Sequence, residues 1–419
     1  MPHYARRFAA VDAQTFWMSA QVPNDQFLLY AFEGLPEPDA VLPAVIARAN
    51  ACADLMVRIA DDCTLRYPRW VPGAVDRSQF LVHDPADLDW AGCLTAVAAL
   101  AEDQLDPRTA AWRLHVFAPV RGVPWTGSAA TVVVLQIAHC LADGTRSAEL
   151  AAWLFGREVP VTTLAPGRRG SLVLRSVAAA RTHRAMAADL GAGRLPTAGE
   201  PQPLVPTNNA PTGRRWIRTL LRHRAELPAG RTVTVAVLAA VAGALDGYLR
   251  DRGSEPVPLC AEVLLAKPGI RLAQNHFRNV GIGLHPELGP VARAAAIDAD
   301  LQAGRARAEH PAAPAADRAF AATPAPLLRW GVGHFDPNVR AERVTGATVV
   351  SSVNRGPSDL QFGTAPVLWT AGYPALSPMM GLTHGVHGLG DTIAISVHGA
   401  ESAVDIDDYV ARLDHALGR

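Results

Sequence analysis

The run of residues 130–138, ATVVVLQIA, constrains the fold of this chain more than any other segment. It is almost continuously apolar and rich in valine, which is the pattern of a buried β-strand. Segments with helical spacing precede and follow it. We therefore expect a mixed class, α/β or α+β, in which this strand lies inside a sheet.

Helical and strand patterns occur in both halves of the chain. Amphipathic helices are expected at 40–53 and 88–104, a helix with Ser147 as its N-cap at 147–155, and a helix with a small-residue face at 232–250. Strands are expected, besides the one above, at 112–118, 259–266, 344–353 and 392–397.

Two stretches rich in proline, 191–213 and 309–337, interrupt these patterns. Such stretches are typical of crossovers or surface loops. We therefore expect an N-terminal subdomain, a crossover linker and a C-terminal subdomain, at 1–190, 191–225 and 226–419.

Charge and cysteine content narrow the function class. Lys and Arg together number 39, as do Asp and Glu, so the formal net charge is zero and no nucleic-acid partner is expected. The five cysteines are scattered without CxxC spacing, which predicts buried thiols in a reduced compartment and neither disulfides nor a metal site.

The first residues lack the apolar core of a signal peptide, and the apolar stretch 233–245 is short for a bilayer span. A soluble cytoplasmic protein is expected.

One segment concentrates groups suited to catalysis, His139-Cys140-Leu141-Ala142-Asp143-Gly144. An imidazole at the mouth of a buried strand is held rigidly, and its ordinary pKa of about 6.5 suits a general base at neutral pH. The carboxylate of Asp143, on a glycine-assisted turn, can fix the loop by binding a cation or backbone N–H groups. On chemistry alone, a plain strand end followed by a turn remains an equal alternative.

The HxxxDG pattern after an apolar strand resembles the active-site motif of the CoA-dependent acyltransferase superfamily. The bacterial wax ester synthase/diacylglycerol acyltransferase branch is most similar, with patchy but collinear likeness at residues 8–34, 105–117, 234–249, 351–357, 374–382 and 396–399. Ala138 stands where that family commonly has a second histidine, and Thr234-Val235 where it has Asn-Asp. With these departures, a specialised acyltransferase with a different acceptor fits at least as well as long-chain wax or triacylglycerol synthesis.

The resemblance implies two chloramphenicol-acetyltransferase-like sandwich subdomains with an active-site tunnel between them. His139 would be the general base and Asp143 a structural, orienting residue paired with a cation of the other half. We predict Lys267, the only lysine in the chain, as that cation, with Arg271 and Arg278 as rivals. No permanently bound cofactor is implied, and acyl-CoA would be a co-substrate.

Four further residues are predicted to contact substrate: Gly144, Ser352, Asn354 and His384. Ser352 and Asn354 could donate hydrogen bonds to a developing oxyanion, although a plain strand-to-loop transition is the alternative. For His384 and the neighbouring His387 the alternative is a hairpin with exposed histidines. Cys140 is not expected to act as a nucleophile, because adjacent residues of a strand point to opposite faces.

Together these observations predict an acyltransferase that moves an acyl group from acyl-CoA, or a carrier-protein thioester, to a small-molecule or lipid alcohol or amine in lipid or secondary metabolism. The alternative is a non-catalytic or condensation-like member that binds an acyl carrier protein in a biosynthetic pathway. Peripheral membrane contact is compatible with either. Chain length, acceptor and oligomeric state are not set by the sequence.

Overall fold

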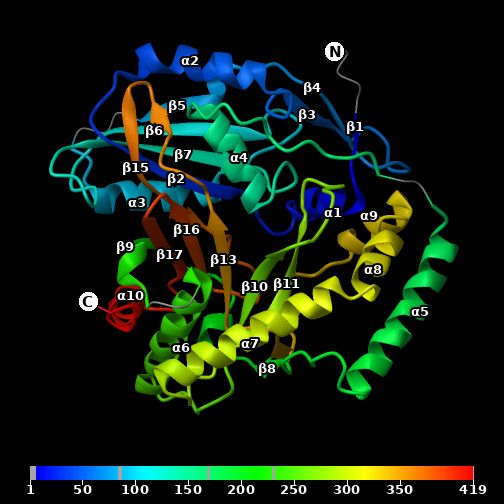
Figure 1. Cartoon of the computed structure of the whole chain (residues 1–419). Coiled ribbons are helices and arrows are strands. Elements are labelled where there is room, and N and C mark those ends of the chain that lie inside the picture. The colour runs from blue at the N-terminus through cyan, green and yellow to red at the C-terminus, as the bar shows by residue number, and fades with distance from the viewer. Residues whose placement is uncertain (1–5, 84–86, 168–169, 229–231, 419) are drawn as a thin grey trace.

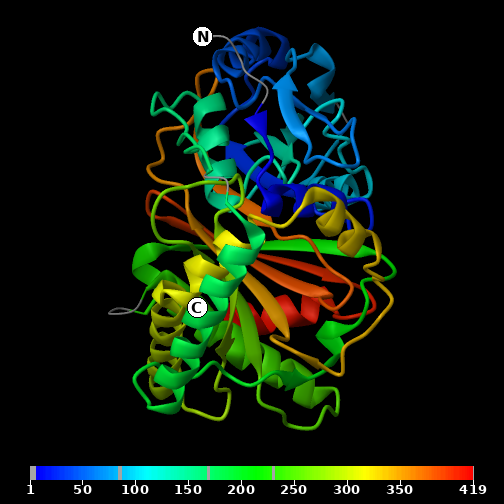
Figure 2. The ribbon, with the colours of Figure 1, turned by 90° about the vertical axis from the view of Figure 1, so that its right-hand side faces the viewer.

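The computed structural model describes residues 6–83, 87–167, 170–228 and 232–418. They form two halves stacked one above the other (Figures 1 and 2). Each half is built on a six-stranded mixed sheet with helices packed against it. The expected mixed class with two sheet-based subdomains is therefore confirmed.

The first part of the chain supplies the elements β1 (Arg6–Arg7), α1 (Ala10–Met18), β2 (Gln26–Phe32), α2 (Pro38–Ala51), β3 (Val57–Ala60), β4 (Arg69–Pro72), β5 (Phe80–His83), α3 (Trp90–Ala99), β6 (Trp112–Val120), β7 (Ala130–Ile137), α4 (Gly144–Leu154) and α5 (Leu172–Gly191). Short 3-10 turns lie at Arg77–Gln79 and Leu100–Glu102.

The second part supplies β8 (Gln202–Pro203), β9 (Arg215–His223), α6 (Val233–Asp251), β10 (Cys260–Ala266), β11 (Phe277–Gly283), α7 (Pro290–Glu309), α8 (Ala312–Phe320), α9 (Ala325–Gly333), β12 (Arg343–Val344), β13 (Thr348–Asn354), β14 (Gln361–Phe362), β15 (Ala365–Tyr373), β16 (Leu382–Leu389), β17 (Thr392–Ala400) and α10 (Ile406–Ala416). Further 3-10 turns lie at Pro206–Asn208 and Arg224–Glu226.

Strand β7, the apolar run that the sequence singles out, lies inside the upper sheet, whose order is β14-β15-β2-β7-β6-β5. Every residue of β7 is buried. Val133 and Leu135 belong to the core beneath α2 and α4, whereas Val132 and Val134 pack on the α3 side. A continuous apolar sequence is needed here because both faces of the strand are covered.

The lower sheet has the order β11-β10-β13-β16-β17-β9, and its core side is covered by α6, α7 and α10. Helix α6 begins where the sequence predicts, with the Thr232 side chain accepting a hydrogen bond from the Val235 N–H. By length and composition α6 could also cross a membrane, but most of it is buried in this core. Burial alone therefore accounts for its apolar sequence.

Two strands correct the predicted subdomain boundaries. Strand β15, expected in the C-terminal subdomain, pairs with β2 and extends the upper sheet; it is the orange strand that rises into the blue and cyan half in Figure 1. Strand β9, expected in the crossover linker 191–225, pairs along its whole length with β17 at the edge of the lower sheet. The chain therefore crosses between the halves more often than a single linker would require.

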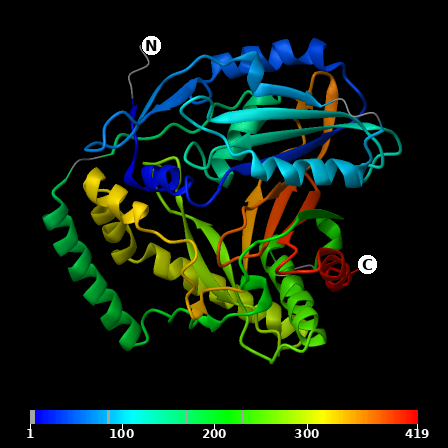
Figure 3. The ribbon, with the colours of Figure 1, turned by 180° about the vertical axis from the view of Figure 1, so that it is seen from behind.

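A shared core fixes the two halves to each other. Helix α3 packs with Leu94 and Val97 against Ile217 and Leu221 of β9, so one hydrophobic cluster contains residues of both sheets. Figure 3 shows α3, in cyan, between the upper sheet and the lower half. The halves therefore share a continuous buried surface rather than being tethered only by linkers.

Two local predictions are wrong. The stretch 309–337 is not a loop but contains α8 and α9, with Pro311 and Pro324 at their N-cap positions. Helix α4 begins at Gly144 rather than at Ser147, and its N-cap is Asp143. In both cases residues that often end or interrupt structure instead start a helix.

The two sheets touch at a pair of glycines, Gly372 of β15 and Gly385 of β16. A methyl group on Gly385 would clash with the backbone carbonyl of Gly372 and with the His387 ring. We expect Gly385→Ala to lower the free energy of unfolding by about 1–3 kcal/mol in urea titrations, since backbone cannot move aside easily. Gly127→Ala is the control, because a methyl group there meets no neighbour within 4 Å. Equal stability of the two variants would contradict this contact.

Candidate active site

His139 lies two residues after the end of β7, where a loop of the C-terminal half meets the N-terminal sheet. The Leu141 N–H donates to the Ala138 carbonyl at 2.8 Å, which turns the chain away from the strand. The His139 ring stacks on Phe277, the first residue of β11, with ring centroids 5.8 Å apart and planes 22° apart. Its backbone carbonyl accepts a hydrogen bond from Asn275 Nδ2 at 2.9 Å. Both halves of the molecule therefore position this histidine.

The surroundings of His139 favour the neutral imidazole. Burial lowers the pKa of His139 below its ordinary 6.5, and the nearby backbone carbonyls and the Asp143 carboxylate only partly oppose that effect. Nδ1 is buried and has no hydrogen-bond partner among the described residues. Because Nδ1 is enclosed, Nε2 is the nitrogen left to meet a ligand. A neutral imidazole is able to accept a proton.

Asp143 is a junction between the halves. Its carboxylate accepts the Arg146 N–H at 3.0 Å as the N-cap of α4 and the His276 N–H at 2.8 Å. It also forms an ion pair with Arg271, with Arg271 Nη1 2.7 Å from Asp143 Oδ2, and both side chains are largely buried. Asp143 thus holds the loop 267–276 of the C-terminal half against the motif.

The predicted pairing of Asp143 with Lys267 is wrong. Lys267 Nζ lies 3.1 Å from Asp317 Oδ1, and Arg278 binds the other oxygen of the same carboxylate. Arg271, named as a rival, is the partner. Lys267 directly follows β10, whereas Arg271 lies further along the loop, which turns back toward Asp143.

Asp12 and Asn275 belong to this arrangement although neither was a candidate. The Asp12 carboxylate accepts the Gln274 and Asn275 N–H groups, each at 2.9 Å, and burial raises the pKa of Asp12 to about 6. Asn275 also donates from its side chain to Asp12 and to the His139 carbonyl. Asp12 therefore acts on His139 through Asn275. The sequence does hold a clue to Asp12, because this residue lies in the opening segment 8–34, which carries part of the family resemblance.

The four residues predicted to contact substrate lie in different surroundings and do not form one cluster. Gly144 starts α4, and a Cβ there would lie 3.2 Å from Val353 Cγ2 of β13, so α4 and the lower sheet meet closely. Ser352 Oγ lies 2.9 Å from Thr234 Oγ1, at the start of α6. Asn354 is exposed and caps its own turn by accepting the Gly356 N–H. The hydroxyl and the amide oxygen are thus bound to nearby groups of the C-terminal half.

His384 and His387 are buried, so the expectation of exposed histidines in this hairpin is wrong. The two nitrogens of His384 contact Thr348 Oγ1 and the Tyr409 hydroxyl, each at 2.8 Å, within the C-terminal core. This position argues against the predicted substrate contact of His384. Burial lowers the pKa of His384 to about 3, so it is neutral throughout the physiological range.

The structure gives no support for a cysteine nucleophile or, among the described residues, for a metal site. Cys140 is buried, and burial raises the pKa of its thiol well above 9, which does not suit a nucleophile. Within the described ranges no group of three or more His, Cys, Asp or Glu side chains is arranged to hold a metal ion.

Two cavities adjoin the upper half. The larger, about 380 Å³, lies between α1, the segment 104–108 and α9. The smaller, about 10 Å³, is lined by residues of both halves, among them Asp25, Tyr373 and His398. Neither is lined by His139, so the tunnel predicted around this residue stays a prediction.

The fold, though not the sequence, matches known proteins. No family model and no curated protein matches the sequence. The wax ester synthase/diacylglycerol acyltransferase from Marinobacter aquaeolei VT8 superposes with a TM-score of 0.63 at 19% identity, and the match covers 98% of both chains. A starter condensation domain of rhizomide synthetase, solved as a variant in complex with C8-CoA and Leu-SNAC, gives a TM-score of 0.58 at 14% identity over 99% of this chain and 93% of that one.

Proposed function

We propose that this chain, which has the fold of CoA-dependent acyltransferases, transfers an acyl group from an acyl thioester to a hydroxyl or amine, with His139 as the general base. The observation that carries the proposal is the placement of His139. Its imidazole is neutral, enclosed at Nδ1 and held by contacts from both halves of the molecule.

The proposed reaction needs one base and no covalent intermediate. Nε2 of His139 takes the proton of the acceptor O–H or N–H as the acceptor atom attacks the thioester carbonyl. The resulting tetrahedral oxyanion collapses, the C–S bond breaks, and the CoA thiolate leaves. The imidazolium returns its proton to the thiolate, so that atoms and charges balance. Asp12, Asn275 and the Asp143–Arg271 pair position the base and are not consumed.

Acyl-CoA is proposed as the donor because the structural neighbours include a condensation domain with C8-CoA bound. A carrier-protein thioester is the second candidate donor, since that same neighbour is a domain of a synthetase. The reacting thioester is the same in both cases, and only the group that carries it differs.

The test is thiol release from a series of acyl-CoAs, short to long, with and without a mixture of alcohols and amines. Acceptor-dependent release is the expected result, and the preferred chain length reports the size of the donor site. Product formation only with an acylated carrier protein would assign the second donor. Absence of product with both donors would contradict the proposal and favour a docking role.

The pH profile gives an independent prediction. Because burial lowers the pKa of His139, its neutral form persists to lower pH than that of an ordinary histidine. We therefore expect kcat/KM to fall on the acid side with a midpoint below pH 6.5, measured with a donor of pH-independent stability. A midpoint above pH 6.5 would contradict this prediction, because it would mean that the pKa of the base is raised and not lowered.

A further inference from the structure

Arg355 is a buried arginine whose charge has no counterion in the described part of the chain. The residue directly follows β13 and is 5% exposed, and no carboxylate lies near enough to act on its charge. The other arginine buried within the described ranges, Arg146, lies 2.9 Å from a carboxylate oxygen of Asp54. An unpaired charge is costly inside a protein, so the missing anion sets Arg355 apart.

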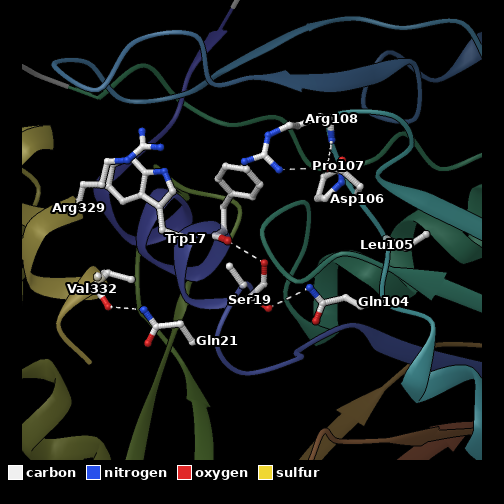
Figure 4. Close-up of a pocket in the computed structure, with 13 residues that line it drawn as sticks. Trp17, Ser19, Gln21, Gln104, Leu105, Asp106, Pro107, Arg108, Arg329 and Val332 are labelled. Carbon is white, nitrogen blue, oxygen red and sulfur yellow. Dashed lines mark hydrogen bonds and ion pairs between the residues drawn. The ribbon is translucent and has the colours of Figure 1, made fainter. Parts of the chain in front are cut away.

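The arginines of the larger cavity differ from Arg355 in this respect. Arg108 and Arg329, labelled in Figure 4, both line that cavity. Arg329 Nη1 lies 3.0 Å and Arg108 Nη2 4.0 Å from oxygens of the enclosed Asp61 carboxylate, and Arg108 also pairs with Asp106 at 3.3 Å. Each of these cations therefore has a carboxylate supplied by the chain.

The contacts that Arg355 makes are with neutral groups. Nη1 donates to the Thr370 hydroxyl, and to the Ala371 carbonyl at 2.9 Å. The guanidinium lies 5.3 Å from the centre of the Tyr30 ring. Nη2 has no hydrogen-bond partner among the described residues and, unlike Nε, is not fully enclosed. These contacts fix the side chain but leave its charge unpaired and Nη2 free to donate.

His387 lies beside this free donor. A Cβ on Gly372 would lie 2.6 Å from Arg355 Nη2 and 3.0 Å from His387 Nε2, so both nitrogens face the same glycine. Burial and the Arg355 charge lower the pKa of His387 well below 6.5, which keeps its imidazole neutral. Nδ1 is enclosed, whereas Nε2 is not and has no partner in the described ranges. With its proton on Nε2, His387 adds a second N–H donor next to Nη2.

One positive charge and two adjacent donors suit a carboxylate. A carboxylate carries a single negative charge, and each of its oxygens can accept one of the two hydrogen bonds. A phosphate dianion would leave one charge uncompensated and further oxygens without donors in this buried place. A neutral ligand would leave the Arg355 guanidinium unpaired.

This pair of side chains lies between the two halves of the molecule. Gly372 is one of the two glycines at which the sheets touch. Val353, two residues before Arg355, is the residue that a Cβ on Gly144 would meet at 3.2 Å, and alternate residues of a strand share a face. Arg355 therefore lies on the side of β13 that faces the HxxxDG motif.

We propose that Arg355 and His387 bind a carboxylate carried by one of the two substrates, either the acceptor or the acyl thioester. One oxygen accepts a hydrogen bond from Arg355 Nη2 and the other from His387 Nε2, and the guanidinium gains the counterion that the chain does not supply. The substrate is then a hydroxy acid, an amino acid or the thioester of a dicarboxylic acid. The assignment to a substrate rests on the proposed acyl transfer, whereas the binding of carboxylates does not.

The first test measures binding by isothermal titration calorimetry and needs no catalysis. The probes are ω-hydroxycarboxylates and ω-carboxyacyl-CoAs, short to long, each paired with its methyl ester. The ester keeps the shape and removes the charge, so we expect the acid to bind about 10- to 100-fold more tightly in at least one series. Equal affinity for acid and ester in both series, or no binding of any acid, would overturn the proposal.

Variants of Arg355 locate the bound carboxylate. Arg355→Gln removes the charge and should abolish the preference for acid over ester, whereas Arg355→Lys keeps the charge and should retain a reduced preference. Arg293→Gln, in α7, is the matched control, because Arg293 is also partly buried and donates to backbone carbonyls. The control should bind like the wild type. An unchanged preference in folded Arg355→Gln would contradict the site, and the wild-type comparison of acid with ester needs no variant to fold.

Kinetics then identify the substrate that carries the carboxylate. Thiol release is measured with a hydroxy acid or its methyl ester as acceptor, and separately with an ω-carboxyacyl-CoA or its methyl ester as donor. The assigned substrate is the one for which kcat/KM favours the acid and loses that preference in Arg355→Gln. Carboxylate binding without thiol release would support the site and contradict the acyl transfer. Thiol release without any preference for an acid would contradict the site alone.

Discussion

Replacing His139 with alanine is expected to lower the rate of acyl transfer by about 100- to 10,000-fold, which is the usual contribution of a positioned general base. The two chain neighbours of His139 cannot take over the role, because Ala138 has no titratable group and the Cys140 thiol is buried with a raised pKa. The rate is measured as acceptor-dependent thiol release at saturating donor.

The matched control is His183→Ala, which removes an exposed imidazole from α5. That variant should keep wild-type activity, and both variants should retain cooperative thermal unfolding. If His139→Ala reacts within about threefold of the wild type, the general-base role is wrong. A protein that only docks a carrier would bind it equally well with either substitution.

Replacing Arg271 with methionine is expected to lower the free energy of unfolding by about 3–5 kcal/mol, because it leaves the largely buried Asp143 carboxylate without its cation. Urea unfolding of the purified variant measures the loss. Activity should fall as well, since the loop that carries Asn275 loses one of its anchors to the motif.

Lys267→Met is the matched control, because it removes a cation from the end of the neighbouring strand. Its partner Asp317 is partly exposed and keeps Arg278, so we expect a change within about 1 kcal/mol. Adding Asp143→Asn to Arg271→Met should recover part of the lost stability by removing the unpaired charge. Equal losses in the two single variants would show that the Asp143–Arg271 pair does not stabilise the fold.

The parts of the fold that sequence predicts well are those with a strong local pattern. Strands β6, β7, β10 and β17 and helix α6 lie within a few residues of their expected bounds. Strand β7 is a continuous apolar run that is buried on both faces, and α6 carries apolar side chains at helical spacing that lie in the core of the lower half. Helices α8 and α9 were missed because their prolines suggest a loop, whereas Pro311 and Pro324 precede the first helical turn, where proline's missing N–H costs nothing.

The candidate site was predictable only where one segment carries it. His139 and Asp143 are four residues apart on a strand end and a helix cap, so local reasoning finds both. Asp12, Arg271 and Asn275 come from two distant segments, and their contacts with the motif arise only when the β10–β11 loop docks. The spacing of residues along the chain does not determine the path of a loop. For this reason the sequence leaves three candidate partners for Asp143, namely Lys267, Arg271 and Arg278, and does not select one of them.

The pairing of β15 with β2 has a consequence for how the chain folds during synthesis. Until the ribosome has made residue 373, β2 is an edge strand with an apolar sequence and unpaired backbone groups, although most of the N-terminal half already exists. Domains ordinarily fold in order as they emerge. Here the first sheet is completed by one of the last strands, so the β15 side of β2 stays unpaired through much of translation and is open to pairing with another chain.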